Sequence, residues 1–215
     1  MILGCTPKDV PREPIISLPS RVEAVGDLDV TDALTLRGAG ADATVIDARV
    51  VEQAVMAWSP AALDVSALRI LGSQLTDSSA TSLASIAAGG PLKLADVTIE
   101  GGTGLGVSYG SGVPGRIERS IIRDNRSGGI RTGSPLHLVD SRVENNGPDP
   151  AAFGSEAAGI FADADLYIER SLLADNRPVA VRGTFGWAHY LVRDSTFQSN
   201  GVQGRLTAVN TTFDG

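Results

Sequence analysis

The sequence predicts an all-β solenoid, in which the chain winds into stacked coils of short parallel strands. A motif recurs in its second half: an aliphatic residue, a Ser three positions later, an apolar residue two further on, and an Asn five after the Ser. The motif's Ser120, Ser141, Ser171 and Ser195 are 21, 30 and 24 residues apart, so a fixed core alternates with segments of variable length. The 25 Gly and 11 Pro, with Val, Ile and Leu in short runs, favour short strands and tight turns over helices.

The N-terminal segment differs from the rest of the chain. We divide the chain into a tether at residues 1–20 and one elongated domain at residues 21–215. The stretch from Ile2 to Cys5 resembles the end of a bacterial lipoprotein signal, so we expect Cys5 as a lipidation site. An ordinary disordered N-terminus explains the same residues equally well. Because Cys5 is the only cysteine, it cannot form an internal disulfide, and the redox compartment stays open.

Each repeat offers three places for a strand: one before the Ser, one directly after it, and one after the Asn. Three such short strands cannot bury their faces alone, but parallel stacking of successive repeats aligns equivalent residues into inward aliphatic columns. The first predicted column holds Leu94, Ile117, Leu138, Ile168 and Val192; the second Ile99, Ile122, Val143, Leu173, Phe197 and Phe213; the third Val107, Ile130, Ile160 and Val181.

The repeated Ser and Asn residues are expected at the corners of the coils. Both are short polar residues that bond to neighbouring backbone, and Asn tolerates the left-handed conformation of sharp corners. In the copy that starts at Leu94, the equivalent positions are Val97 and Gly102, and Gly meets the same conformational demand. We interpret these residues as structural ladders and not as a ligand-binding array.

With this motif, the chain resembles the right-handed parallel β-helix, or pectin-lyase-like, repeat proteins. The motif matches at residues 117–130, 138–160, 168–181 and 192–200. In addition, residues 34–40 leading to 44–47 look like the opening coil of many such proteins. The resemblance covers about residues 26–215 and implies a right-handed parallel β-helix of about seven to eight coils. It says little about activity, because the fold hosts lyases, hydrolases, epimerases, phage tailspikes and non-catalytic surface proteins.

Two insertions border the third strand position. Asn146 and Ile160 are 14 positions apart where other coils have 5, so one loop at 147–157 carries nine extra residues, and a smaller excess lies at 183–189. Insertions in solenoids collect on the face that binds. The outward residues expected on this face are Ser108, Arg131, Phe161 and Arg182, with Tyr109 and Asp163 nearby and Phe153 and Trp187 on the overhanging loops.

We predict that this face binds an acidic sugar chain, because Arg pairs with carboxylates in a bidentate manner and aromatic rings stack on sugars. In proteins of the family it resembles, the same face holds the polysaccharide groove. The predicted ligand-binding residues are Tyr109, Arg131, Phe161, Arg182 and Trp187. As an alternative, Arg131 and Arg182 are solvated strand residues that discourage aggregation.

Catalytic residues are not predicted. Lyases and hydrolases of the resembled family need several acidic residues on the groove strands, for calcium or for paired acid and base, and the expected groove residues carry none. Asp163 and Asp165 lie two residues apart in a turn, and Asp149 and Glu156 lie on the long loop. A Ca²⁺ ion is therefore the one cofactor the sequence leaves open, with Asp163 and Asp165 as its ligands.

Three functions agree with the sequence. The first is an exported or cell-surface bacterial module, lipid-anchored if Cys5 is modified, that binds a polysaccharide or surface glycan or serves a structural role. The second is a polysaccharide lyase or glycoside hydrolase acting on an acidic polysaccharide. The third is a subunit that stacks on itself or on another surface protein through an open coil at 210–215. A net charge of -7 disfavours nucleic acid and anionic membranes, and no apolar run is long enough to span a bilayer.

Overall fold

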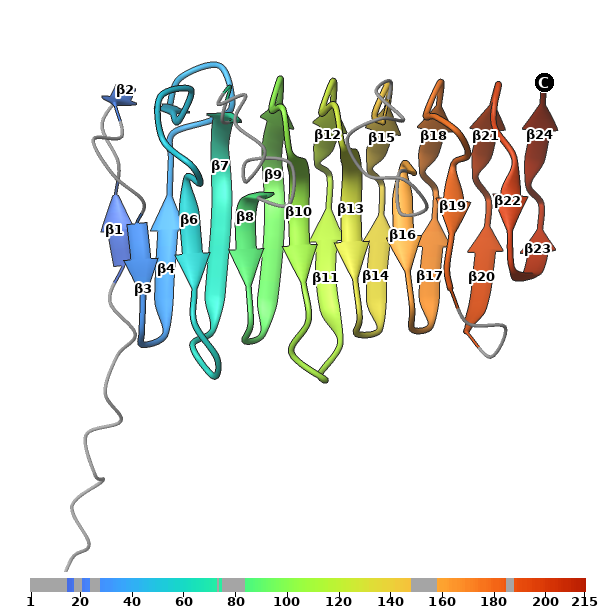
Figure 1. Ribbon diagram of the computed structural model, residues 1–215, viewed down its shortest axis with the longest axis horizontal. Coiled ribbons are helices and arrows are strands. Elements are labelled where there is room, and N and C mark those ends of the chain that lie inside the picture. The colour runs from blue at the N-terminus through green and yellow to red at the C-terminus, as the bar shows by residue number, and fades with distance from the viewer. Residues whose placement is uncertain are drawn as a thin grey trace, which may run out of the picture.

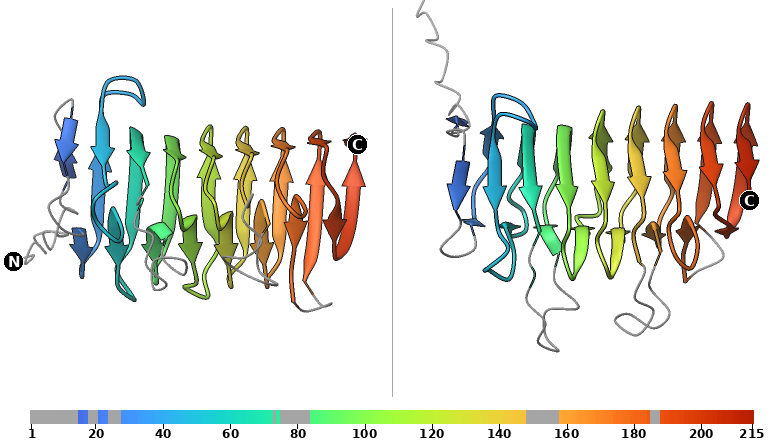
Figure 2. Two further views of the ribbon diagram at one scale, coloured as in Figure 1. Left: turned by 45° about the horizontal axis from the view of Figure 1, so that its top comes forward. Right: turned by 90° about the horizontal axis from the view of Figure 1, so that it is seen from above.

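The computed structural model describes residues 15–17, 21–23, 28–72, 74, 84–147, 158–184 and 188–215, and all regular secondary structure among them is β-strand. The strands form three parallel columns along the long axis, and each coil contributes one strand to each column in turn (Figure 1). Figure 2 shows the coils stacked from the N-terminal to the C-terminal end. Among the described residues, no helix suited to crossing a membrane occurs.

The first column consists of β1 (Ile15–Ser17), β4 (Leu34–Arg37), β7 (Leu63–Leu71), β9 (Leu92–Glu100), β11 (Gly115–Glu118), β14 (Leu136–Val139), β17 (Leu166–Glu169), β20 (His189–Arg193) and β23 (Arg205–Val209). The second consists of β2 (Arg21–Glu23), β5 (Val45–Asp47), the second halves of β7 and β9, β12 (Ile121–Arg123), β15 (Arg142–Glu144), β18 (Leu172–Ala174), β21 (Thr196–Gln198) and β24 (Thr212–Asp214). The third consists of β3 (Leu28–Val30), β6 (Val55–Ala57), β8 (Ala84–Ala88), β10 (Leu105–Tyr109), β13 (Gly128–Thr132), β16 (Ile160–Ala162), β19 (Val181–Arg182) and β22 (Val202–Gln203).

Because β7 and β9 run through two columns, the first and second columns form one 16-stranded sheet, and the third is a separate eight-stranded sheet. In the described part of the chain the third column has eight strands and each of the other two has nine, against about seven to eight predicted coils. The predicted all-β, parallel β-helix is confirmed.

The three predicted aliphatic columns form the core. Ile117 pairs in register with Leu94 and Leu138, Ile122 with Ile99 and Val143, and the remaining members follow in the predicted order. The third column is likewise in the predicted register. These side chains are buried, except that Phe213 on β24 is 49% exposed and stacks on Phe197 with ring centroids 5.0 Å apart.

The predicted ladders are also present. The backbone N–H of Ser120 donates to Ser141 Oγ at 3.2 Å, and the N–H of Ser141 donates to Ser171 Oγ at 3.1 Å. At the other corner, the N–H of Asn125 donates to Asn146 Oδ1 at 3.2 Å. The earlier copy joins both ladders as expected, because the N–H groups of Val97 and Gly102 donate to Ser120 and Asn125. Each coil therefore supplies acceptors for the backbone of the coil before it.

The left-handed conformation expected of the ladder Asn and of Gly102 is a prediction that proved wrong. The residue one position earlier adopts it, with φ of 57° at Asp124 before Asn125 and 74° at Gly101 before Gly102. The same holds before the Ser positions, where Arg119 has a φ of 46°. The left-handed residue turns the chain, and the residue that follows then has its side chain inside, within reach of the neighbouring backbone.

Ion pairs join the left-handed residues at the corner between the first two columns. Arg119 binds Asp96 with Nε and Nη2, both at 2.9 Å, and Arg170 binds Asp140 at 2.7 and 2.9 Å. The hydrogen bonds from Arg119 are the main reason that the pKa of Asp96 lies below its ordinary value, and Arg170 has the same effect on the pKa of Asp140. Bidentate pairing thus compensates for a left-handed conformation that arginine does not favour.

The Gly that precedes the inward Ile of the third column fits closely against the Asn ladder. A Cβ at Gly129 would lie 2.5 Å from the carbonyl oxygen of Gly159 and 3.1 Å from Asn146 Nδ2, and a Cβ at Gly159 would lie 2.6 Å from Asn176 Cγ. The close spacing of the coils therefore leaves no room for a side chain at the residue before the inward Ile, which explains the recurrent Gly-Ile pair.

The β-helix begins within the segment expected to be a tether, because β1 pairs in parallel with β4. Cys5 lies outside the described residues. The division of the chain at residue 20 stays a prediction.

Candidate functional site

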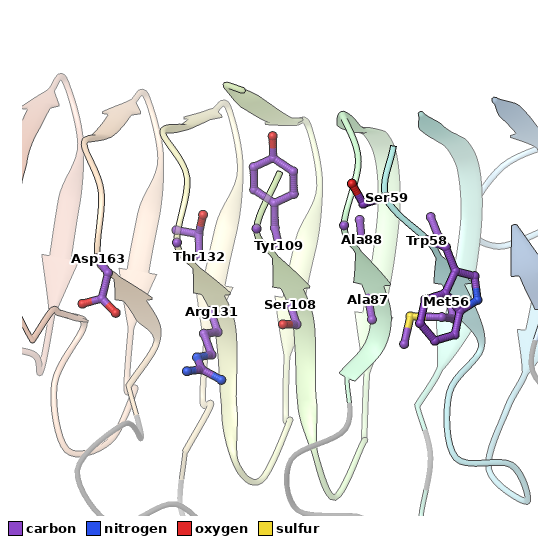
Figure 3. Close-up of a pocket in the computed structure, with 14 residues that line it drawn as sticks. Met56, Trp58, Ser59, Ala87, Ala88, Ser108, Tyr109, Arg131, Thr132 and Asp163 are labelled. Atoms are coloured by element: carbon purple, nitrogen blue, oxygen red, sulfur yellow. The ribbon is translucent and has the colours of Figure 1, made fainter. Parts of the chain in front are cut away.

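The outer face of the third column contains a groove of about 520 Å³. Its lining comes from β6, β8, β10, β13, the residue after β16, and the turns that follow these strands (Figure 3). Neighbouring strands lie about 4.8 Å apart, so the four steps from β6 to β16 extend over about 19 Å. A groove of this length suits an extended chain better than a compact small molecule.

Small side chains form the floor of the groove. Ala87 pairs in register with Met56 on one side and with Ser108 on the other, and Ser108 pairs with Arg131. These residues share the outward face of their strands, and only the methyl and hydroxyl groups of Ala87 and Ser108 project in the middle. The groove is therefore a depression between the larger side chains at its two ends.

Trp58 stands at one end of the groove, directly after β6. Its side chain is 53% exposed, and its Nε1 donates to Asp29 Oδ1 at 3.1 Å, which fixes the orientation of the ring. Sequence reasoning missed both Trp58 and Met56, because their coil lacks the Ser and Asn motif. The available signal was the alternation of Val55 and Ala57 followed by an aromatic residue and a Ser-Pro turn.

Arg131 lies toward the other end of the groove and is exposed, as the sequence predicted for this position. Arg182, expected beside it, is half-buried and is not part of the lining. Trp187 and Phe153 lie outside the described residues. The part of these residues in ligand binding stays a prediction.

Two predicted aromatic contacts are buried. Tyr109 borders the groove but is 3% exposed, and its hydroxyl donates to the carbonyl of Val113 and hydrogen-bonds with Ser111 Oγ at 2.6 Å. Burial raises the pKa of this hydroxyl. Phe161 pairs in register with the outward Arg131, yet it is also 3% exposed. Neither ring presents an open face on which a sugar could stack.

The two candidate metal ligands each hold a backbone N–H of the next coil. Asp163 Oδ1 accepts from the N–H of Thr184 at 2.9 Å, and Asp165 Oδ1 accepts from the N–H of His189 at 2.9 Å. Among the residues that the structure describes, no three His, Cys, Asp or Glu side chains gather in a metal-binding group. Asp149 and Glu156 lie outside those residues, so calcium binding stays a prediction. Asp163, unlike Asp165, lines the groove.

Comparison with known proteins gives structural likeness alone. No protein-family model and no curated protein matches the sequence. Among solved structures, the chain is similar to the ORF18 protein of Geobacillus virus E2, with 13% identity and a TM-score of 0.48, over 94% of this chain and 52% of that one. It thus spans about half the length of the viral protein.

The chain is also similar to the A-module of the mannuronan C-5 epimerase AlgE4 from Azotobacter vinelandii, with 12% identity and a TM-score of 0.37, over 94% of this chain and 87% of that module. The architecture of the present chain is established by its three columns of parallel strands, which are in the register described above. The protein has a parallel β-helix fold.

Proposed function

We propose that the protein is a non-catalytic module that binds a glycan containing an acidic sugar in the groove of the third column. The observation that carries this proposal is the order of side chains along the groove: an exposed Trp58 ring, a floor of Ala87 and Ser108, and the guanidinium of Arg131. The low floor admits a chain lying across the strands. A sugar ring can stack on Trp58 while a carboxylate pairs with Arg131.

The small number of carboxylates among the described residues of the groove favours binding over catalysis. Glycoside hydrolysis needs two positioned carboxyl groups, and proton abstraction beside a carboxylate needs that charge neutralised. Among the described residues that line the groove, Asp163 is the one carboxylate, and one of its oxygens already accepts a backbone N–H. The proposed location, outside the cell or on the bacterial surface, follows from the lipoprotein-like stretch before Cys5.

The test measures binding of acidic and neutral polysaccharides by calorimetry in the presence of a chelator. We expect Arg131→Ala to weaken binding of an acidic glycan about tenfold or more, because a charge-assisted hydrogen bond is lost. Arg126→Ala is the matched control, since Arg126 is exposed in the same coil but does not line the groove.

Trp58→Ala should weaken binding of all glycans that bind, with Tyr167→Ala as its control. Tyr167 is 37% exposed and stacks on His137 on the face of the first column, with centroids 4.6 Å apart. Binding that survives both groove substitutions would contradict the proposal. Release of an unsaturated, ultraviolet-absorbing product when calcium is added would show a lyase instead.

A further inference from the structure

We propose that the groove selects glycans in which an isolated acidic sugar is flanked by neutral or amine-bearing sugars, and that Asp163 disfavours uniformly acidic chains. This inference rests on the proposed glycan binding and adds a substrate class to it. It comes from the charges that the strands place along the groove, one strand after another.

The chemistry of the groove changes at each strand. From β6 to β16, the groove offers in turn an aromatic ring at Trp58, a methyl group at Ala87, a hydroxyl at Ser108, a cation at Arg131 and an anion at Asp163. Figure 3 shows Arg131 and Asp163 on adjacent coils. Among the described lining residues, Arg131 is the single cation. The groove therefore has one place for a carboxylate.

A negative charge lies where one neighbour of that carboxylate would be. Asp163 follows the strand next to β13, and its backbone N–H donates to the carbonyl of Thr132 at 2.9 Å, which fixes its place beside the β13 level. Beyond Trp58, Asp29 adds a second acidic side chain at the opposite end. A chain with a carboxylate on every sugar would gain at Arg131 and be repelled at Asp163.

The orientation of Asp163 is fixed by the protein. Its Oδ1 accepts from the N–H of Thr184 at 2.9 Å, so the carboxylate does not depend on a ligand for its position. A hydroxyl or ammonium group of the adjacent sugar can donate to this carboxylate, whereas the carboxylate of a second uronate cannot donate and is repelled. Asp163 thus acts as a specificity residue that both rejects one class of chain and holds another.

The experiment compares Asp163→Asn with the wild-type protein on two sets of oligosaccharides of equal length. Oligogalacturonates carry a carboxylate on every sugar, whereas hyaluronan oligosaccharides alternate a uronate with a neutral N-acetylated sugar. Because Asn keeps the oxygen that accepts from Thr184, the fold is expected to be retained. Removal of one like charge at a surface site should raise oligogalacturonate affinity up to about fivefold. Hyaluronan affinity should stay the same or fall.

Asp165→Asn is the matched control. Asp165 also accepts a backbone N–H at 2.9 Å, from His189, but it does not line the groove, so this substitution should change neither affinity. An unchanged oligogalacturonate affinity in Asp163→Asn overturns the inference, and so does a wild-type preference for oligogalacturonate over hyaluronan. Glycan binding itself then stands as long as Arg131→Ala weakens it. If Arg131→Ala and Trp58→Ala change nothing, the proposed function fails first.

Discussion

Asn146→Ala tests how much the Asn ladder contributes to the stability of the coil. The side chain is fully buried, and its Nδ2 donates to Ile122 O at 2.9 Å, to Glu144 O at 3.0 Å and to Asn176 Oδ1 at 3.0 Å. Its Oδ1 accepts from the backbone N–H and from Nδ2 of Asn125, at 3.2 and 3.0 Å. The substitution therefore removes hydrogen-bond partners from the coil before Asn146 and from the coil after it.

The cost follows from the groups left without partners. A buried donor or acceptor without a partner costs about 1–3 kcal/mol, and here the N–H of Asn125 loses its acceptor while Asn176 loses a donor. We expect a loss of about 4 kcal/mol in the free energy of unfolding, a large part of the stability of an ordinary domain. Urea denaturation followed by circular dichroism measures it.

Asn200→Ala provides the comparison at the end of the ladder. Asn200 is half-buried, and its Oδ1 accepts from the backbone N–H and Nδ2 of Asn176, both at 3.2 Å. Its loss should cost about half as much, because partners on one side only are affected. Hydrogen exchange at the Asn125 amide should rise in Asn146→Ala and remain unchanged in Asn200→Ala. If Asn146→Ala lowers stability by less than about 0.5 kcal/mol, as an ordinary surface change does, the ladder is not a source of stability.

Two further predictions concern the coil spacing and the corner ion pairs. Gly129→Ala should lower stability by about 2–4 kcal/mol because its Cβ would meet the Gly159 carbonyl at 2.5 Å, whereas Gly133→Ala, with nothing within 4 Å, should leave the thermal midpoint unchanged. Equal midpoints for the two variants would contradict the steric argument. Carboxyl NMR should show a pKa for Asp96 below its ordinary value of 3.8, restored by Arg119→Gln. Because the pKa of Asp96 is lower in the folded state, the ion pair stabilises the protein at a pH above the unfolded pKa, and this stabilisation is lost as the pH falls through the folded pKa. A titration of Asp96 that Arg119→Gln leaves unchanged would refute this prediction.

The sequence could predict the core and the ladders because both depend on residue type at a repeated spacing. Ile117, Ile122 and Asn125 have equivalents in each of the coils that carry the full motif, and this one motif places them all. The left-handed corners could not be found in this way. Their positions hold residues as different as Arg119 and Asp124, because an ion pair or a short polar side chain can each support the same backbone conformation.

The groove was only partly predictable for a different reason. Arg131 was placed correctly because it follows the repeat, and Trp58 was missed because its coil does not carry the motif. Strand alternation places Tyr109 inward once Ser108 is outward, which its burial and its bond to Val113 bear out. Phe161 occupies the position that the exposed Arg131 has in the coil before it, yet Phe161 is buried. The spacing of the motif therefore does not indicate its burial.

Inward and outward positions therefore carry different information. The inward columns and the ladders fix the coil geometry, and they leave the outward residue of each coil free to differ, as it does from Ala87 to Ser108 to Arg131. A substitution on the outward face should then change recognition without changing the spacing of the coils. For this reason the effects of Arg131→Ala and Asp163→Asn can be interpreted as changes in binding, whereas Asn146→Ala reports on the fold. If Arg131→Ala or Asp163→Asn lowered the stability as much as Asn146→Ala does, this separation would be refuted.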